Sequence, residues 1–417
     1  MVLSDCLARV QEGASGLSRA PAAAPPAQTA AADGRDGEAE ALIATRLVLH
    51  CPGFEPLDAK AHRARYVRAA RQSAAVHGLA VEAGPLEPEG SASAFTVTCR
   101  TPEGAAVTSR IVLFDHAALV ARLTRRPLAR RLAAGALSAA RVVGEGGLAG
   151  YLRHGWRFAL FFLFPFLLVT LMLAASGLAA ALPVLFGFSS VHLAWSGPLA
   201  LLLFTHVLLP LGSPLHTLLL FADWEMAVAV ARQDSAPVNA WLDQAFETAR
   251  GAIEKAGAVD EIVVSGHSMG ASIAALLLGR LIERDPARLV AARLAMVTLG
   301  SAILQCALLR SAVRLRADVG RIARHPGLVW VDVQCLTDPI HFYKAPVVAL
   351  CGHPDAPAAS ILQLRLKQVL TPERYRRIRL SFLRVHRQYV LGPDRPGRFD
   401  FTRLTAGPRP AESLRER

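Results

Sequence analysis

The stretch "VVSGHSMGAS", residues 263–272, decides the fold, because a strand-like and a helix-like segment meet in it. The β-branched run at residues 261–265 indicates a short buried strand. The apolar "ASIAALLLGRLI" that follows indicates a helix. Between them, Gly266-His267-Ser268-Met269-Gly270 matches G-x-S-x-G, a pattern that presents a nucleophilic serine on a sharp turn. The alternative interpretation is a serine in a tight glycine turn without any chemistry.

The chain around this turn alternates between strand-like and helix-like segments. This alternation is typical of an α/β fold with a mainly parallel sheet and helices on both faces. The expected strands cover residues 47–49, 94–101, 107–115, 261–265, 293–301 and 327–338, and the expected helices cover residues 59–78, a stretch through Leu242, Phe246 and Ile253, the segment after the turn, and residues 312–323.

From Phe158 to Ala222 the chain contains no Asp, Glu, Lys or Arg. A membrane-spanning helix needs about 20 apolar residues, so we expect a transmembrane hairpin with spans at 158–182 and 198–221. Pro210 and Pro214 should kink or end the second span. The alternative is a buried hairpin in a large soluble core, but a core helix usually carries a polar stripe, and these segments carry none.

The positive charges lie beside this apolar region. The net charge is +13, and it comes almost wholly from arginine. An anionic lipid surface explains such a distribution, and no segment resembles a nucleic-acid-binding module, so we expect a lipid bilayer and no nucleic acid as partner. By the positive-inside rule, both flanks of the hairpin lie in the cytoplasm. The flanking arginines are Arg122, Arg125, Arg126, Arg130, Arg131, Arg141, Arg153, Arg157 and Arg232.

A serine nucleophile needs an acid and a base, and both follow it in the chain in hydrolases of this strand–turn–helix type. Asp338 is the last residue of the segment 327–338, just past the end of its strand and before Pro339, in a loop from which a carboxylate can reach across. Asp332 falls inside that strand and is expected to pair locally. We therefore predict Asp338 as the acid.

Three histidines follow Ser268 at positions where a base could stand. His386 lies beyond the last strand-like stretch and is the predicted base. His341 is too close to Asp338 in sequence to span to Ser268 easily, and His353, on a loop, remains a rival.

Two backbone N–H groups are expected to stabilise an oxyanion. One belongs to Met269, at the start of the helix after the turn. The other belongs to Gly53 or Phe54 in "HCPGFEP", after the strand at 47–49. In the same loop, His50 is expected to shape the backbone and Glu55 to pair with an arginine.

At this point the sequence resembles serine hydrolases of the α/β-hydrolase superfamily, nearest to class 3 lipases and esterases. "VVSGHSMGAS" resembles the lipase turn "GHSxGG", "MVTLGS" the strand that follows it, and "LTDPI" the acid-bearing "DPV" loop. The resemblance covers residues 47–54 and 261–390. It implies an α/β-hydrolase-type sheet, here interrupted by the hairpin and with Ala271 in place of a second glycine.

These observations predict a membrane-anchored serine hydrolase that cleaves an apolar acyl ester through an acyl-enzyme on Ser268. It would lie in a bacterial inner membrane with its hydrolase domain in the cytoplasm. The six cysteines form no CxxC pair, and no cofactor or metal is expected. An acyltransferase or thioesterase would use the same residues, and a non-catalytic membrane scaffold is the other alternative. The expected parts are a disordered tail at 1–40, a first hydrolase part at 41–120, the arginine-rich flank and hairpin at 121–235, a second hydrolase part at 236–400 and a C-terminal tail at 401–417.

Overall fold

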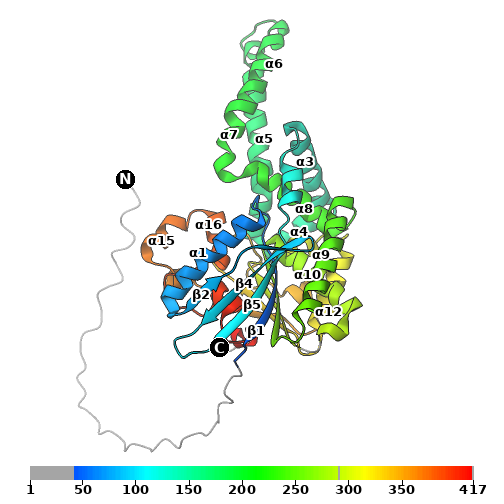
Figure 1. Ribbon diagram of the computed structural model, residues 1–417. Coiled ribbons are helices and arrows are strands. Elements are labelled where there is room, and N and C mark those ends of the chain that lie inside the picture. Colours follow the sequence, from blue (N-terminus) through cyan, green and yellow to red (C-terminus); the bar gives the residue numbers. More distant parts are fainter. Residues whose placement is uncertain (1–41, 290–291, 416–417) are drawn as a thin grey trace, which may run out of the picture. The chain divides into compact units, whose positions relative to one another are not determined.

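A computed structural model describes residues 42–289 and 292–415 of the chain, so the expected disordered tail lies outside the described residues. Its centre is a nine-stranded sheet (Figure 1). The strands are β1 (Thr45–Cys51), β2 (Ala80–Ala83), β3 (Glu87–Glu89), β4 (Ala92–Arg100), β5 (Ala106–Leu113), β6 (Glu261–His267), β7 (Arg293–Leu299), β8 (Val329–Gln334) and β9 (Ser360–Gln363).

The sheet is mostly parallel, as the alternation of elements predicts. Its order is β2-β4-β5-β1-β6-β7-β8-β9, with β3 paired to β4. Strands β5, β1, β6, β7, β8 and β9 run parallel to one another, and β4 pairs antiparallel with β5, β2 and β3. All expected strands are present, whereas the short strands β2, β3 and β9 were not foreseen.

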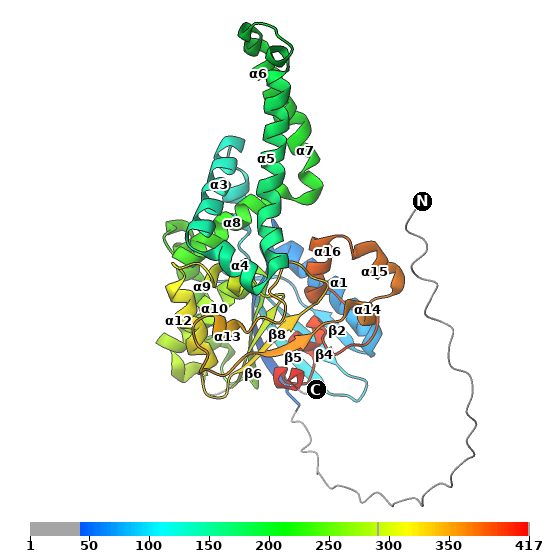
Figure 2. The same cartoon turned by 180° about the vertical axis from the view of Figure 1, so that it is seen from behind.

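Helices cover both faces of the sheet (Figures 1 and 2). Side chains alternate across a strand, and in β1 Leu47 and Leu49 therefore join the core under one helical layer while Val48 joins the other. The helices are α1 (Ala59–His77), α2 (Ala117–Thr124), α3 (Leu128–Gly144), α4 (Gly147–His154), α5 (Trp156–Leu185), α6 (Leu193–Leu202), α7 (Leu209–Leu211), α8 (Thr217–Arg232), α9 (Ala236–Ala256), α10 (Met269–Arg284), α11 (Ile303–Ala307), α12 (Val313–Ala323), α13 (Val347–Leu350), α14 (Leu366–Val369), α15 (Pro372–Ile378), α16 (Phe382–His386) and α17 (Phe401–Ala406).

Short helical segments of other types join these elements. The 3₁₀ segments are η1 (Ser190–His192), η3 (Ser213–Leu215), η4 (Pro286–Leu289), η5 (Arg387–Val390) and η6 (Ala411–Leu414), and η2 (Leu203–Leu208) is a π-helical segment.

The apolar region forms two antiparallel helical arms that extend from the helical layers (Figure 1). The first arm is α5, and the second runs from η1 through α6 and η2 to α7. Their pairing is fixed by hydrogen bonds from the Ser176 hydroxyl to the Ala200 carbonyl (2.5 Å) and from the Ser196 hydroxyl to the Ala180 carbonyl (2.7 Å). Both arms are long and apolar enough to span a membrane.

The second arm differs from the expected span at 198–221. It begins at Ser190 and ends at Leu211. Pro210 lacks a backbone N–H, and the preceding turns widen into the π-helical η2, in which the Leu209 N–H bonds to the Phe204 carbonyl. The chain then turns through His216, whose φ is 54°.

The stretch Ser213–Arg232, which joins η3 to helix α8, also qualifies as a span by length and composition, yet α8 packs into the body. In the stretch Ser213–Arg232, 61% of the residues in the most apolar window are buried, against 22% in Ser190–Leu211. Leu220 and Phe221, expected at the end of a span, are core residues of α8. We therefore treat α8 as part of the body.

The C-terminal segment, expected as a tail from residue 401, is part of the core. Phe401 and Leu404 of α17 are buried beside β1 and β4. Asp400 caps this helix by accepting hydrogen bonds from the Thr402 and Arg403 N–H groups.

A buried ion pair fastens this segment to the sheet. Arg46 of β1 and Glu261 of β6 are almost fully buried, and the Arg46 Nε lies 2.6 Å from a Glu261 carboxylate oxygen. Arg46 also donates to the Gly407 and Arg409 carbonyls, and Glu261 accepts from the Ala411 N–H. Every charged group of the pair is thus satisfied, as burial requires.

Removing one partner of the Arg46–Glu261 pair should therefore lower the free energy of unfolding more than removing both. Arg46→Met leaves the Glu261 carboxylate buried without its cation, and we expect a loss of about 3–5 kcal/mol in the free energy of unfolding. The double variant Arg46→Met/Glu261→Leu should recover part of this loss, as measured by denaturant unfolding in detergent. Arg250→Met, which breaks an exposed pair with Glu247, is the control. A double variant that is less stable than Arg46→Met would contradict this account.

Candidate active site

Ser268 stands at the end of β6 in a conformation that few non-glycine residues adopt. Its φ is 55° and its ψ is −125°. The Ser268 N–H donates to the Leu299 carbonyl (3.0 Å), and the Ser268 carbonyl accepts from Ala271 and Ala302. Such backbone strain persists only where the surroundings enforce it, and it is the conformation of a strand–turn–helix nucleophile elbow.

The two glycines of the motif are required by close backbone approach. A Cβ on Gly266 would lie 2.5 Å from the Cα of Ala271. A Cβ on Gly270 would overlap the carbonyl oxygens of Cys51 and Pro52, in the loop after β1. The turn can therefore form only with glycine on both sides, which explains the G-x-S-x-G spacing.

The predicted acid and base are hydrogen-bonded to each other. The His386 Nδ1 lies 2.7 Å from the Asp338 Oδ2, and both side chains are buried. The His386 Nε2 has no hydrogen-bond partner among the described residues. With Nδ1 engaged by a carboxylate, Nε2 is the ring nitrogen that remains to accept a proton.

Asp338 has further partners that the sequence did not reveal. Tyr389 donates its hydroxyl to the Asp338 Oδ2 (3.1 Å), the Ile340 N–H donates to Oδ1 (3.0 Å), and the His341 Nδ1 lies 3.4 Å from Oδ2. Burial raises the pKa of Asp338, but His386 and His341 outweigh burial and bring its pKa well below the ordinary value. The carboxyl group therefore stays ionised. His341 thus contacts the same carboxylate as His386, at the longer of the two distances.

Two neighbouring groups place His386 above the elbow. A Cβ on Gly300, which follows β7, would stand 3.1 Å from the His386 Cε1. His267, beside Ser268, bonds through Nε2 to the His386 carbonyl (3.0 Å), and the two rings lie 4.8 Å apart. Burial lowers the pKa of His267 to about 3, so this neighbour is neutral.

The loop after β1 lies against the elbow, as expected for the second oxyanion donor. A Cβ on Gly53 would be 3.2 Å from the Cβ of Ser268. Phe54 follows and stacks on His116. Met269, the other expected donor, is the first residue of α10 and is fully buried. The structure thus brings Gly53, Ser268 and Met269 together.

Glu55 holds this loop in place through two arginines. It pairs with Arg65 of α1 and, at 2.7 Å, with Arg387 of η5. Burial raises the pKa of Glu55, but the two arginines outweigh burial and lower the pKa to about 2. Because Arg387 is the residue after His386, this network links the loop after β1 to the segment that carries the predicted base. The expectation that Glu55 pairs with an arginine is confirmed.

The rival residues have other partners. Asp332 accepts hydrogen bonds from Thr298 (2.6 Å) and Gln334 (2.7 Å) inside the sheet. His353 contacts α12, where its Nε2 lies 2.8 Å from the Arg316 carbonyl. His50 bonds to the hydroxyl of Ser265, its cross-strand partner in β6, at 2.6 Å.

Asp223 of α8 is a buried acid near the site that the sequence analysis did not single out. It accepts a hydrogen bond from the Gln305 side chain (3.1 Å), and Gln305 in turn accepts from Tyr151 through its carbonyl (2.5 Å). Burial raises the pKa of Asp223 to about 6, although the Gln305 hydrogen bond and the nearby His386 act in the opposite direction. Only its position directly after the charge-free stretch marks it in the sequence.

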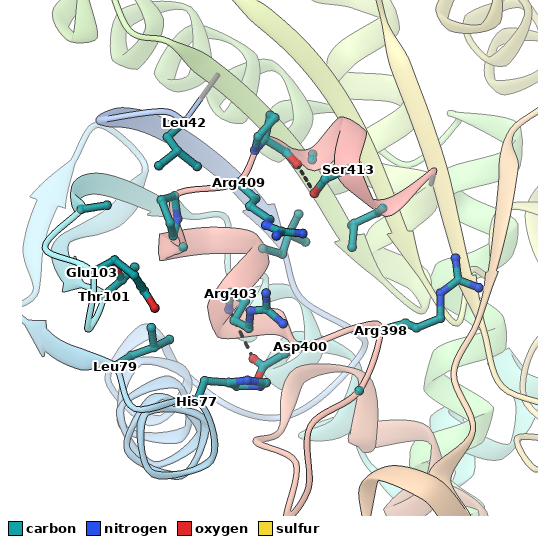
Figure 3. A pocket seen from close by; sticks show the side chains of 18 of the residues that line it. Leu42, His77, Leu79, Thr101, Glu103, Arg398, Asp400, Arg403, Arg409 and Ser413 are labelled. Carbon is teal, nitrogen blue, oxygen red and sulfur yellow. Dashed lines mark hydrogen bonds and ion pairs between the residues drawn. The ribbon is translucent and has the colours of Figure 1, made fainter. Parts of the chain in front are cut away.

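The described part of the chain also contains a cavity away from Ser268. Among the described residues, no group of His, Cys, Asp and Glu side chains could hold a metal ion. A cavity of about 640 Å³ lies at the amino ends of the parallel strands, where His77, Thr101, Asp400 and Arg403 line it (Figure 3). None of Ser268, Asp338 and His386 lines this cavity.

The family model described as Lipase (class 3) matches residues 221–324, about a quarter of the chain. The match contains β6, the elbow and α10 and ends before Asp338 and His386. It supports a lipase-like hydrolase. No curated protein and no solved structure matches the chain.

The pKa of Glu55 gives a stability prediction with a defined pH window. Its pKa in the folded protein, about 2, lies below the ordinary value of 4.5, so its stabilising effect is complete above pH 4.5 and disappears as the pH falls toward 2. The free energy of unfolding of Glu55→Gln should therefore be about 3 kcal/mol lower than that of wild type at neutral pH. This difference should shrink as the solution is acidified. Denaturant unfolding at a series of pH values tests this.

Glu247→Gln is the matched control, because Glu247 is an exposed glutamate paired with an arginine on α9. It should change stability little at any pH. A loss for Glu55→Gln that stays constant between neutral and acid pH would show that the carboxylate charge is not the stabilising feature.

Proposed function

We propose that this protein is a membrane-anchored serine hydrolase that cleaves an apolar acyl ester. The observation that carries the proposal is the strained Ser268 between β6 and α10, with the hydrogen-bonded Asp338–His386 pair above the same end of the sheet. The class 3 lipase match over residues 221–324 supports the same chemistry.

In the proposed mechanism, the Ser268 hydroxyl attacks the ester carbonyl and His386 Nε2 takes its proton. Asp338 holds the imidazole through Nδ1 and stabilises the positive charge that forms on the ring. The Met269 N–H and an N–H of Gly53 or Phe54 stabilise the oxyanion. His386 then protonates the leaving alcohol, and an acyl-enzyme remains on Ser268.

Water completes the cycle in a hydrolase. His386 removes its proton, the hydroxide attacks the acyl carbonyl, and the Ser268 oxygen leaves with the proton from the ring. An acyltransferase would use an alcohol in place of water, and a thioesterase would begin from a thioester. Product analysis with and without added alcohol separates hydrolysis from transfer.

Exposure of the two helical arms supports membrane anchoring. Large apolar side chains on both arms lie on the surface, among them Leu171 (67% exposed), Phe186 (77%) and Leu201 (62%). Soluble proteins rarely expose contiguous apolar surface of this extent. A buried hairpin in a soluble core, the alternative, would hide these side chains.

The foot of α5 contacts the loop that carries the acid, which supports a lipid substrate. Phe158 packs on Phe342 with ring centroids 4.3 Å apart, and Arg157 donates to the Leu336 carbonyl (2.8 Å). The site therefore lies where the proposed membrane helices leave the body. An acyl ester in the bilayer would reach Ser268 over a short path.

The central prediction concerns the three reacting groups. Ser268→Ala, Asp338→Asn and His386→Ala should each lower ester hydrolysis by about 10³-fold or more, and the triple variant should be no slower than the slowest single variant. A fluorophosphonate should label wild type and fail to label Ser268→Ala.

Asp332→Asn and His353→Ala serve as controls for these substitutions, because both residues pair elsewhere. Each should keep most of the activity. Full activity in Ser268→Ala would exclude the hydrolase and leave the scaffold interpretation. Loss of turnover in folded His353→Ala, with activity kept in His386→Ala, would reassign the base.

The membrane prediction is tested separately. The protein should remain in the pellet after carbonate extraction. In a Cys6→Ser background, an impermeant maleimide on intact cells should label Ser189→Cys, at the tip of the arms, and reach Glu247→Cys, on α9, only after lysis. Release by carbonate, or the reverse labelling pattern, would refute the proposed anchoring.

A further inference from the structure

An exposed turn precedes the predicted base. Leu380, between α15 and α16, is 88% exposed, the largest exposed fraction of any large apolar side chain in the described part of the chain. Exposed arginines stand on both sides of it. We name residues 376–384 the Leu380 turn, and its arginines are Arg376, Arg377, Arg379 and Arg384.

The charge of this turn is largely uncompensated. Arg376 pairs only with Glu373, at 3.4 Å, and both side chains are exposed. Arg377, Arg379 and Arg384 have no ion-pair partner in the part of the chain that the structure describes. One exposed leucine surrounded by unpaired arginines is the composition of an interfacial membrane contact on an anionic surface.

The position of the turn matches the level at which α5 leaves the body. Phe382, two residues after Leu380, packs edge-to-face on Phe161 of α5 with centroids 6.0 Å apart. On the outer side of α5, the neighbouring Leu160 is 55% exposed. Helix α16 lies near the foot of α5 in both views, and α15 lies farther out at the edge of the body (Figures 1 and 2).

We propose that the Leu380 turn is a second membrane contact, in which Leu380 enters the interfacial region of the bilayer and the arginines bind the phosphates of anionic lipids. The proposal rests on the proposed function in one respect, because it takes α5 and the second arm as membrane helices. With those arms in the bilayer, a turn at the foot of α5 lies at the headgroup level.

This contact has a consequence for the substrate. Helix α16 runs from the Leu380 turn to His386 and is in contact with α5, so the base lies directly behind the membrane-facing turn. A turn bound to anionic headgroups would hold the mouth of the site against the bilayer. The preferred substrate is therefore an acyl ester that resides in an anionic membrane, and a water-soluble ester gains nothing from this contact.

The depth of Leu380 can be measured with the full chain in lipid nanodiscs. The described cysteines are buried, so Leu380→Cys in a Cys6→Ser background offers one accessible thiol for an environment-sensitive fluorophore. In nanodiscs that contain phosphatidylglycerol, its emission should shift to the blue and be quenched by a lipid-attached quencher. In pure phosphatidylcholine both effects should be weaker. Glu103→Cys, an exposed position at the amino ends of the parallel strands, should show neither effect.

Charge reversal tests the arginines. Arg377→Glu/Arg379→Glu should lower hydrolysis of a fluorogenic acyl ester embedded in phosphatidylglycerol nanodiscs by roughly tenfold. Hydrolysis of a water-soluble short-chain ester and fluorophosphonate labelling should stay unchanged. Arg284→Glu/Arg293→Glu makes the same charge change at exposed positions at the far end of α10 and at the start of β7, and it should leave all three measurements unchanged.

Water exposure of the fluorophore at position 380 in both kinds of nanodisc would overturn the proposal, as would equal losses in the two charge-reversal variants. A blue shift in the emission of this fluorophore that appears only with an added soluble polyanion would assign the turn to a water-soluble partner instead. Failure of the proposed function is distinguishable, because it would appear as loss of fluorophosphonate labelling in wild type while the fluorescence measurement still decides the membrane contact.

Discussion

The parallel pairing of β1 with β6 is the constraint on which the site depends. In this register Cys51 lies opposite Gly266, so the two strands end at the same level. The loop after β1 therefore meets the turn after β6, and Gly270 admits the carbonyls of Cys51 and Pro52. A shift of one residue would turn every side chain of β6 to the other face and move the turn at Ser268 away from the loop after β1. Strain at Ser268 and placement of Gly53 are thus consequences of one register.

Three loops meet at this end of the sheet, and polar contacts fix their relative positions. Asp338 joins the loop after β8 to the segment that carries His386 and Tyr389. Glu55 joins the loop after β1 to the same segment through Arg387. Loops are mobile by default, so a site built on them needs such connections to keep its geometry. The segment that carries His386 is held from two sides by two buried carboxylates.

The residues of the site could be predicted from the sequence because their signals are local. Ser268 lies between a β-branched run and an apolar helix, and Asp338 and His386 follow in the order that the turn type requires. Tyr389 and His341 carry no such signal, because their role depends on a shared partner, Asp338, that the fold must first place. The end of the second arm was missed for another reason. Hydropathy marks 218–221 as apolar, but only packing shows that this stretch belongs to the core helix α8.

The position of the apolar arms in the chain explains why these arms and Ser268 share one end of the sheet. Strand β5 runs parallel to β1, so the chain leaves β5 at Leu113 beside the elbow end. The helices from α2 to α7 are inserted there, and α8 and α9 return the chain to the start of β6. Helix α9 has 21 residues and is about 31 Å long, whereas β6 has 7 residues and is about 23 Å long. The helix is therefore long enough to carry the chain back along the whole length of the strands to the start of β6. If the same helices were inserted in the turn between β4 and β5, they would stand at the opposite end of the sheet. They would then lie beside the cavity of Figure 3, a strand length away from Ser268.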